Sequence, residues 1–179
     1  MKVNKVVFPV AGLGSRFLPA TKSIPKEMLP IIDKPLIQYA VDEAIDAGFS
    51  ELIFITGNTK KAIQDHFKFN PDLNISNLTE DKKNFLSEMH RVIPSHVSCK
   101  YIIQDEPLGL GHAILQAKEA IGEDPFAVVL ADDLIDSKQG VLKQMLDHYK
   151  DENSSIISVQ KIIKSESINY GIIEFKEVN

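Results

Sequence analysis

The sequence lacks several features that define large classes of proteins. It has no tryptophan and only one cysteine, Cys99, so no intrachain disulfide can form and a reducing compartment fits. No apolar run approaches the roughly 20 residues of a membrane span. The start, MKVNKVVFPV, has too short an apolar part for a secretory signal. We therefore expect no membrane association and a cytoplasmic location, with Cys99 as a small apolar residue in a strand.

Two common nucleotide-binding motifs are also missing. The stretch GLGSRF at 12–17 has Phe17 where the dinucleotide fingerprint G-x-G-x-x-G needs its third glycine. The P-loop pattern G-x-x-x-x-G-K-[ST] does not occur. The broken fingerprint argues against a nicotinamide-dependent dehydrogenase.

Positive charge is scarce overall but concentrated near one end. The formal net charge of −5 argues against a general nucleic-acid binder. Residues 1–35, however, hold six lysine or arginine side chains and two acidic ones, a local charge of +4. This distribution suggests that an anionic ligand meets the protein through its N-terminal part.

Strand-like and helix-like segments alternate along the 179 residues. This alternation predicts an α/β fold, with a mostly parallel central sheet and helices on both faces. We expect one domain over residues 1–179 that is truncated at its C-terminal end, because the last predicted strand finishes with no closing element. The predicted strands cover 5–10, 52–56, 99–104, 126–131, 154–160 and 170–175, and the predicted helices cover 34–48, 59–67, 80–93, 109–122 and 139–151.

A stiff basic loop, VAGLGSRFLPATKSIPKEMLP at 10–30, follows the first strand. Ligands of open α/β sheets bind beyond the carboxyl ends of strands. Gly12 and Gly14 permit positive φ and let backbone N–H groups approach an anion, while Arg16 and Lys26 supply cations suited to phosphate. Three prolines fix φ and stiffen the loop. We predict a phosphate-binding loop, the alternative being an ordinary turn with solvated charges.

The same loop resembles a family signature, G-x-G-[ST]-R…P-x-T…P-K-x-[ML]-[LV]-P, of the sugar-1-phosphate nucleotidylyltransferases. The form VAGLGSR is similar to the branch that joins UTP and glucose 1-phosphate into UDP-glucose and pyrophosphate. The resemblance implies a Rossmann-like three-layer fold, Mg²⁺ as cofactor, and catalytic roles for Arg16 at the departing phosphates and Lys26 at the α-phosphate. Open alternatives are a relative that uses dTTP or ATP and a non-catalytic nucleotide-binding fragment.

Base recognition is expected near the third predicted strand. QDEPLGLGHAI at 104–114 is similar to the family's base-recognition segment. The amide of Gln104 could pair with the N3–H/O4 edge of uracil, and Gly109 would let the flat base lie against main chain. The resemblance adds main-chain contacts from Ala11 and Gly12. Without it, Gln104 would be an exposed side chain beside a glycine turn.

A metal is expected where VVLADDLID places Asp132 and Asp133 after the fourth predicted strand. Magnesium binds through one or two carboxylates plus substrate phosphates. The resemblance assigns the metal to Asp132 and leaves Asp133 a supporting or turn-forming role. The alternative is a solvated acidic turn.

The remaining assignments concern the sugar and the partners. NYGIIEF at 169–175 resembles the hexose-contacting segment, which assigns Tyr170 and Gly171 to the sugar; the residues alone indicate an edge strand. His112 is interpreted mainly as a packing residue, with ligand contact as the alternative.

The family's later V-E-K-P segment and second metal-binding aspartate do not occur in this sequence. The resemblance implies UTP and glucose 1-phosphate as partners and a homo-oligomer at full length.

Overall fold

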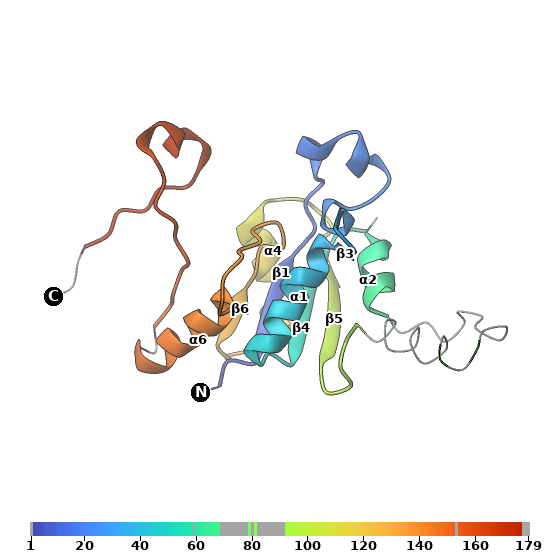
Figure 1. Cartoon of the computed structure of the whole chain (residues 1–179), viewed down its shortest axis with the longest axis horizontal. Helices are drawn as coiled ribbons and strands as arrows, with labels where there is room; N and C mark the ends of the chain where they lie inside the picture. The colour runs from blue at the N-terminus through green and yellow to red at the C-terminus, as the bar shows by residue number, and fades with distance from the viewer. Residues whose placement is uncertain are drawn as a thin grey trace.

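The fold is built on a four-stranded parallel sheet of order β5-β4-β1-β6 (Figure 1). The computed structural model describes residues 2–58, 60–68, 79, 81, 92–152 and 154–176. All three strand pairings are parallel, so the carboxyl ends of the strands lie together at what we call the carboxyl edge. The strands are β1 (Lys5–Pro9), β4 (Glu51–Thr56), β5 (Ser98–Ile103) and β6 (Phe126–Val128), and a small antiparallel hairpin joins β2 (Pro30–Ile31) to β3 (Lys34–Pro35).

Helices cover both faces of the sheet, with α1 in front of it and α4 behind it in Figure 1. Since this sheet is parallel and covered on both faces, the predicted mostly parallel α/β architecture is confirmed. Within the described residues, no helix is long and apolar enough to cross a bilayer. The front face carries α1 (Leu36–Ala47), α2 (Lys61–Phe67) and α6 (Val141–Glu152), the back face α4 (Leu110–Gln116) and α5 (Lys118–Ile121), and the short 3₁₀ helices are η1 (Ser15–Phe17), η2 (Ala20–Lys22), η3 (Lys26–Met28) and η4 (Lys164–Asn169).

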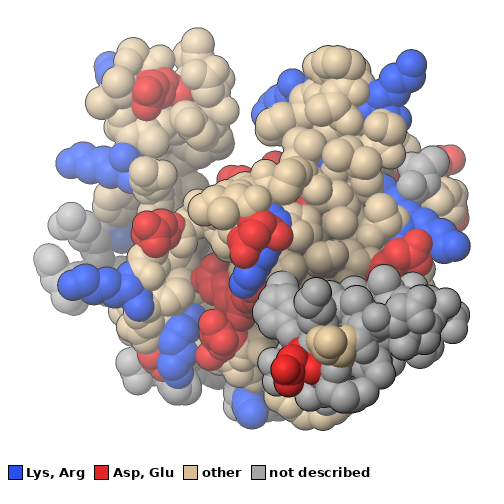
Figure 2. Space-filling view, turned by 45° about the vertical axis from the view of Figure 1, so that its right-hand side comes forward, with Lys and Arg blue, Asp and Glu red and all other residues tan. Residues whose placement is uncertain are grey.

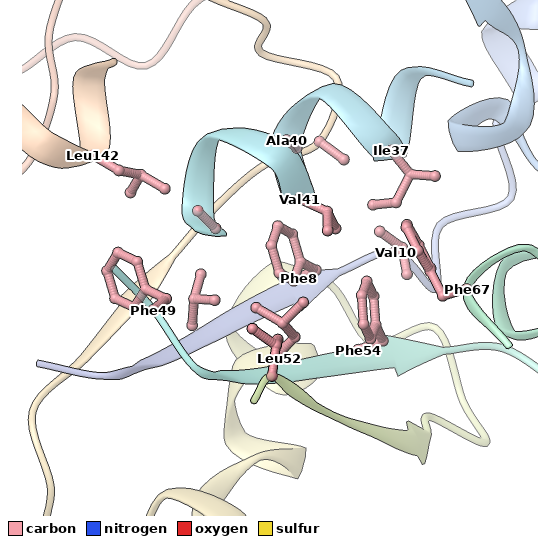
Figure 3. Packing of buried hydrophobic residues seen from close by; sticks show 14 of the residues in the cluster. Phe8, Val10, Ile37, Ala40, Val41, Phe49, Leu52, Phe54, Phe67 and Leu142 are labelled. Atoms are coloured by element: carbon pink, nitrogen blue, oxygen red, sulfur yellow. The ribbon is translucent and has the colours of Figure 1, made fainter. Parts of the chain in front are cut away.

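Strand β1 is buried on both faces, which explains its continuous apolar sequence. Val6 and Phe8 point to the α1 side, whereas Val7 points to α4 and α5, and all three are fully buried. The ring of Phe8 stacks on that of Phe54 with centroids 5.0 Å apart (Figure 3). Burying each such phenylalanine contributes about 1.5–3 kcal/mol, so this layer holds β1 in the centre of the sheet.

The order of the strands reverses at β1. The chain passes from β1 through α1 to β4 on one side, and it returns from β5 through α4 and α5 to β6 on the other side. Ligands of open α/β sheets bind at such a reversal, in the crevice beyond the carboxyl ends of the strands. The loop after β1 therefore begins at the position where this topology builds a site.

Several predicted boundaries needed correction. The predicted helix 109–122 is two helices, α4 and α5, that meet at Ala117. The predicted strand 126–131 pairs only over Phe126–Val128, followed by one further bond from the Val129 N–H to the Val7 carbonyl at 2.9 Å. The predicted helix 80–93 lies almost wholly outside the described residues.

The predicted strands 154–160 and 170–175 are wrong. Neither segment pairs with another strand in the part of the chain that the structure describes. Their apolar side chains are exposed, Ile157 at 66% and Phe175 at 72%, and the segment stands apart from the sheet beside α6 (Figure 1). A strand requires a hydrogen-bonded partner as well as an apolar sequence, and the sequence pattern reports only the second of these.

Candidate active site

Lys26 and Asp132 meet at the carboxyl edge although 106 residues separate them in the sequence. Lys26 opens η3 in the loop after β1, and Asp132 follows β6, the neighbour of β1. The Nζ of Lys26 donates to Oδ2 of Asp132 at 2.6 Å. Because β1 and β6 are parallel, the segments that follow them meet, and two residues predicted to act on phosphate and metal lie in contact.

The electrostatic environment keeps Asp132 ionised. Burial alone raises the pKa of its carboxyl, but the hydrogen bond and charge of Lys26, with a smaller effect from Arg16, outweigh burial and hold the pKa below its usual range. The Asp132 side chain is 46% exposed. The carboxyl edge therefore presents an accessible carboxylate in contact with Lys26, an arrangement that can receive phosphate and a divalent metal together.

Gly14 shapes the loop that carries both cations. Its φ is 65°, and a Cβ placed there would lie 3.1 Å from Cβ of Lys26 and 3.2 Å from Cγ2 of Thr21. The Thr21 hydroxyl donates to the Gly14 carbonyl at 2.7 Å and closes the loop. Only glycine combines this backbone conformation with so close a neighbour. The turn therefore brings η1, with Arg16, and η3, with Lys26, to the same end of the sheet.

Ala11 and Gly12, between β1 and this turn, adopt less constrained backbone positions than Gly14. Ala11 is buried directly beyond β1, and its carbonyl oxygen would lie 3.6 Å from a Cβ at Gly57. Gly12 does not use positive φ, and no atom lies within 4 Å of the place of its missing Cβ. The open surroundings of Gly12 leave its main chain room for a ligand, as the predicted base contacts require.

A buried ion pair beneath the loop was not predicted. Lys60, just before α2, donates to Oε2 of Glu27 at 2.8 Å, and both side chains are almost completely buried. Burial lowers the pKa of Lys60, although the hydrogen bond and charge of Glu27 oppose this effect. The pair fastens η3 to the start of α2 and so fixes the backbone next to Lys26. Helical periodicity treats both residues as polar surface, so no signal in the sequence marks them.

Gln104 also lies at the carboxyl edge, and it is buried rather than exposed. Its Nε2 lies 2.7 Å from Nδ1 of His112 and 3.5 Å from the Gly109 carbonyl oxygen. Gly109 begins α4 with φ of 99°, a conformation that favours glycine. On its other side, Nε2 of His112 lies 3.0 Å from Nε2 of Gln116. The alternative of an exposed glutamine is therefore wrong, and His112 packs against Gln104.

The basic N-terminal part does not form one cluster. Lys5 lies at the other end of β1, where it pairs with Asp124 at 2.6 Å, and Lys34 pairs with Asp42 at 2.8 Å. Arg16 and Lys22 are the charged side chains on the projecting loop of η1 and η2, the upper right lobe of Figure 2, which shows blue and no red. The charge count in the sequence overstated the local charge, because it could not tell which end of β1 each lysine occupies.

The structure does not bring the predicted sugar residues to this site. Tyr170 and Gly171 follow η4 in the segment that stands beside α6, away from the loop after β1 (Figure 1). Asp133 forms a turn, since its N–H donates to the Leu130 carbonyl at 3.0 Å. Among the described residues, no group of three or more His, Cys, Asp or Glu side chains could hold a metal by itself.

Known proteins resemble this chain over most of its length. The sequence model described as nucleotidyl transferase matches residues 5–179. A UTP–glucose-1-phosphate uridylyltransferase of Bacillus subtilis is 49% identical over 173 residues, which are 97% of this chain and 59% of that protein. The chain therefore spans about three fifths of that curated relative.

Solved structures agree in fold. A UTP-bound UGPase from Acinetobacter baumannii superposes with a TM-score of 0.80 at 42% identity, over 86% of this chain and 54% of the other. A UDP-glucose pyrophosphorylase complexed with UDP-glucose gives a TM-score of 0.79 at 43% identity, over 92% of this chain and 60% of the other.

Proposed function

Because the chain belongs to the nucleotidyl transferase family, we propose that it forms the nucleotide-binding part of an enzyme that makes UDP-glucose. The reaction joins UTP and glucose 1-phosphate and releases pyrophosphate. The observation that carries this proposal is the contact between Lys26 and Asp132 at the reversal of the strand order, where the charge of Arg16 also lowers the pKa of Asp132. Cationic side chains and an ionised carboxylate at that position support a site for a nucleoside triphosphate.

In this reaction a phosphate oxygen of glucose 1-phosphate attacks the α-phosphorus of UTP. The bond from that phosphorus to the bridging oxygen of pyrophosphate breaks, and pyrophosphate carries the electron pair away. The attacking phosphate is anionic near neutral pH, so the protein's task is alignment and neutralisation of charge. Lys26 neutralises charge at the α-phosphate, and Arg16 holds the departing β- and γ-phosphates.

Asp132 is the residue that would hold Mg²⁺. Its carboxylate is ionised and half-exposed, and magnesium commonly takes one or two carboxylates with phosphate oxygens completing its shell. When bound, the metal supplies further neutralisation of the triphosphate charge. Before any ligand arrives, the ion pair holds Lys26 and Asp132 close together and limits the ordering that binding requires.

A second function, nucleotide binding without turnover, is favoured by one observation. Tyr170 and Gly171, the residues predicted to contact the sugar, lie in a segment that stands away from the loop after β1.

We also propose a cytoplasmic location, which the single cysteine supports. A homo-oligomeric full-length protein is proposed from the resemblance to the family alone.

Calorimetric titration with UTP and Mg²⁺, combined with a pyrophosphate-release assay containing glucose 1-phosphate, tests these functions. We expect UTP binding, with release from UTP exceeding that from dTTP or ATP. Lys26→Ala and Arg16→Ala should each lower turnover about 100-fold, the usual cost of removing one electrostatic contact in a transition state. Lys22→Ala is the matched control, since Lys22 is an exposed lysine of the same loop.

The outcomes separate the two functions. Binding of UTP without release of pyrophosphate supports the nucleotide-binding function instead of the complete reaction. Turnover at the wild-type rate in both Lys26→Ala and Arg16→Ala contradicts the roles proposed for these residues. Stronger release from dTTP or ATP than from UTP assigns the chain to another branch of the family.

A further inference from the structure

We propose that His112 and Gln116 fix the orientation of the Gln104 side-chain amide, so that its carbonyl oxygen faces the nucleotide base. His112 is then a positioning residue that sets base selectivity without touching the base. This inference rests on the proposed function, in which Gln104 contacts the base. It concerns which of the two amide groups of Gln104, the oxygen or the nitrogen, is available to a ligand.

The contact with Gly109 identifies the amide nitrogen of Gln104. The atom of Gln104 that lies 3.5 Å from the Gly109 carbonyl oxygen is Nε2. A carbonyl oxygen only accepts hydrogen bonds, so the Gln104 group that faces it must be the NH₂. The same nitrogen lies 2.7 Å from Nδ1 of His112. Both hydrogens of the Gln104 amide are thus directed into the protein.

The histidine ring then has only one consistent tautomer. Because Gln104 donates to Nδ1 of His112, the neutral ring carries its proton on Nε2. That Nε2 lies 3.0 Å from the amide of Gln116, and two N–H groups cannot pair with each other. Gln116 must therefore turn its carbonyl oxygen toward the ring, an assignment that the hydrogen-bond network decides. Gln104 thus donates to His112, His112 donates to Gln116, and Gln116 only accepts.

The carbonyl oxygen of Gln104 remains for a ligand. Within the described residues, no hydrogen bond reaches this Oε1, and no buried side-chain nitrogen or oxygen lacks a partner. The oxygen therefore keeps some contact with solvent although Gln104 as a whole is buried. It offers an acceptor at the carboxyl edge, held in place by the neighbouring helix α4.

A fixed acceptor at Oε1 of Gln104 selects among pyrimidine bases by whether their ring nitrogen N3 carries a hydrogen. Uracil and thymine carry a hydrogen on N3 and can donate it to Oε1 of Gln104, whereas N3 of cytosine is an acceptor and would oppose it. An unpaired or opposed buried polar group costs at least about tenfold in affinity. The expected additional bond from Gln104 to O4 of uracil does not form in this arrangement, because both amide hydrogens are already used. Gln104 thus separates UTP from CTP but not from dTTP.

Substitutions at Gln116 test the tautomer of the His112 ring. They leave Gln104 and His112 themselves unchanged. Gln116→Glu can only accept, so it retains the proton on Nε2 of His112 and keeps the preference for UTP over CTP. Gln116→Lys can only donate, so it moves the proton to Nδ1 and forces Gln104 to turn its NH₂ toward the base. The affinities for UTP and CTP, titrated with Mg²⁺, give the readout. We expect a UTP-to-CTP ratio of at least about ten in wild type and Gln116→Glu, and a ratio reduced at least about tenfold in Gln116→Lys.

Two further variants separate this inference from the proposed function. His112→Leu removes the acceptor and should bring the ratio toward one, and His112→Asn, whose side-chain oxygen can accept from Gln104, should restore it in part. Equal ratios in wild type, His112→Leu and Gln116→Lys overturn the positioning role while leaving the nucleotide site intact. If Gln104→Leu leaves both affinities unchanged, or if wild type fails to bind UTP, the base contact itself is wrong and the inference fails with it.

Discussion

Two lysine–carboxylate pairs start from neighbouring residues of one loop and lie in opposite environments. Lys26 pairs with Asp132 at the solvent-accessible carboxyl edge, at 2.6 Å. Glu27, the next residue, pairs with Lys60 at 2.8 Å, and this pair is almost completely buried. The distances are similar, so the two pairs differ mainly in the water that surrounds them. Figure 1 shows their loop between β1 and the β2–β3 hairpin.

This difference separates a structural task from a chemical one. Removing one partner of a buried pair leaves an uncompensated charge, which makes the buried pair hard to break. An exposed pair contributes little to stability, because water and salt compete for both charges. A ligand can therefore take Lys26 or Asp132 as its own partner at small cost, while Glu27 and Lys60 keep the loop in place. The 3₁₀ turn η3 directs one residue inward and its neighbour outward.

The largest expected effect comes from breaking the buried pair. Lys60→Met should lower the free energy of unfolding by about 3–5 kcal/mol, because Glu27 then stays buried without a partner. Lys26→Met, the matched exchange in the exposed pair, should lower it by less than about 1 kcal/mol. Urea unfolding of both variants, followed by circular dichroism, measures the difference.

A double variant provides the control for the buried pair. Replacing both members, as Glu27→Leu with Lys60→Met, should recover most of the loss, since apolar residues of similar volume commonly substitute for a buried ion pair at little cost. Equal losses of stability in Lys60→Met and Lys26→Met would contradict the separation of tasks between the two pairs.

The sequence named Lys26 and Asp132 as site residues without predicting that they pair, and it named neither member of the buried Glu27–Lys60 pair. A strand followed by a glycine turn, with cations behind it, predicts a site at the end of β1, and parallel strands predict that Asp132 lies at the same edge. Burial of Lys60 and Glu27 depends on how α2 packs on η3, and helical periodicity carries no information about that contact. Local patterns locate a site, whereas the groups that hold it rigid depend on tertiary packing.

Two other errors have physical causes of the same kind. The predicted strand 170–175 has the composition of a strand, but its ladder partner is a property of the folded sheet. The positive charge counted in residues 1–35 is divided between the two ends of β1, because a strand carries Lys5 away from Arg16 by its own length. The succession of strands and helices along the chain as far as α6 was predictable, because apolar periodicity reports burial directly.

The next largest expected effect tests how closely the position of Lys26 depends on the turn at Gly14. Gly14→Ala should cost about 1–2 kcal/mol of stability, because φ is positive there and the new Cβ meets Lys26 Cβ at 3.1 Å. It should also weaken UTP binding by displacing Lys26. Gly12→Ala is the control for stability, since φ is not positive and the space around it is open. A loss of stability as large at Gly12 as at Gly14 would show that the turn does not impose this constraint.

The smallest expected effect is a dependence of stability on pH that arises from the Lys26–Asp132 pair. The folded-state pKa of Asp132 is lowered, so its contribution to stability is present above the unfolded value of 3.8 and is lost as the pH falls through the folded pKa. Half-exposure limits this contribution to less than about 1 kcal/mol. Urea unfolding should therefore show Asp132→Asn less stable than wild type at pH 6, and the gap should close as the pH is lowered further and further below 3.8. In a Lys26→Met background the gap should be reduced at every pH, because Lys26 is the main cause of the lowered pKa, and a gap unchanged in that background would mean that another cation stabilises Asp132.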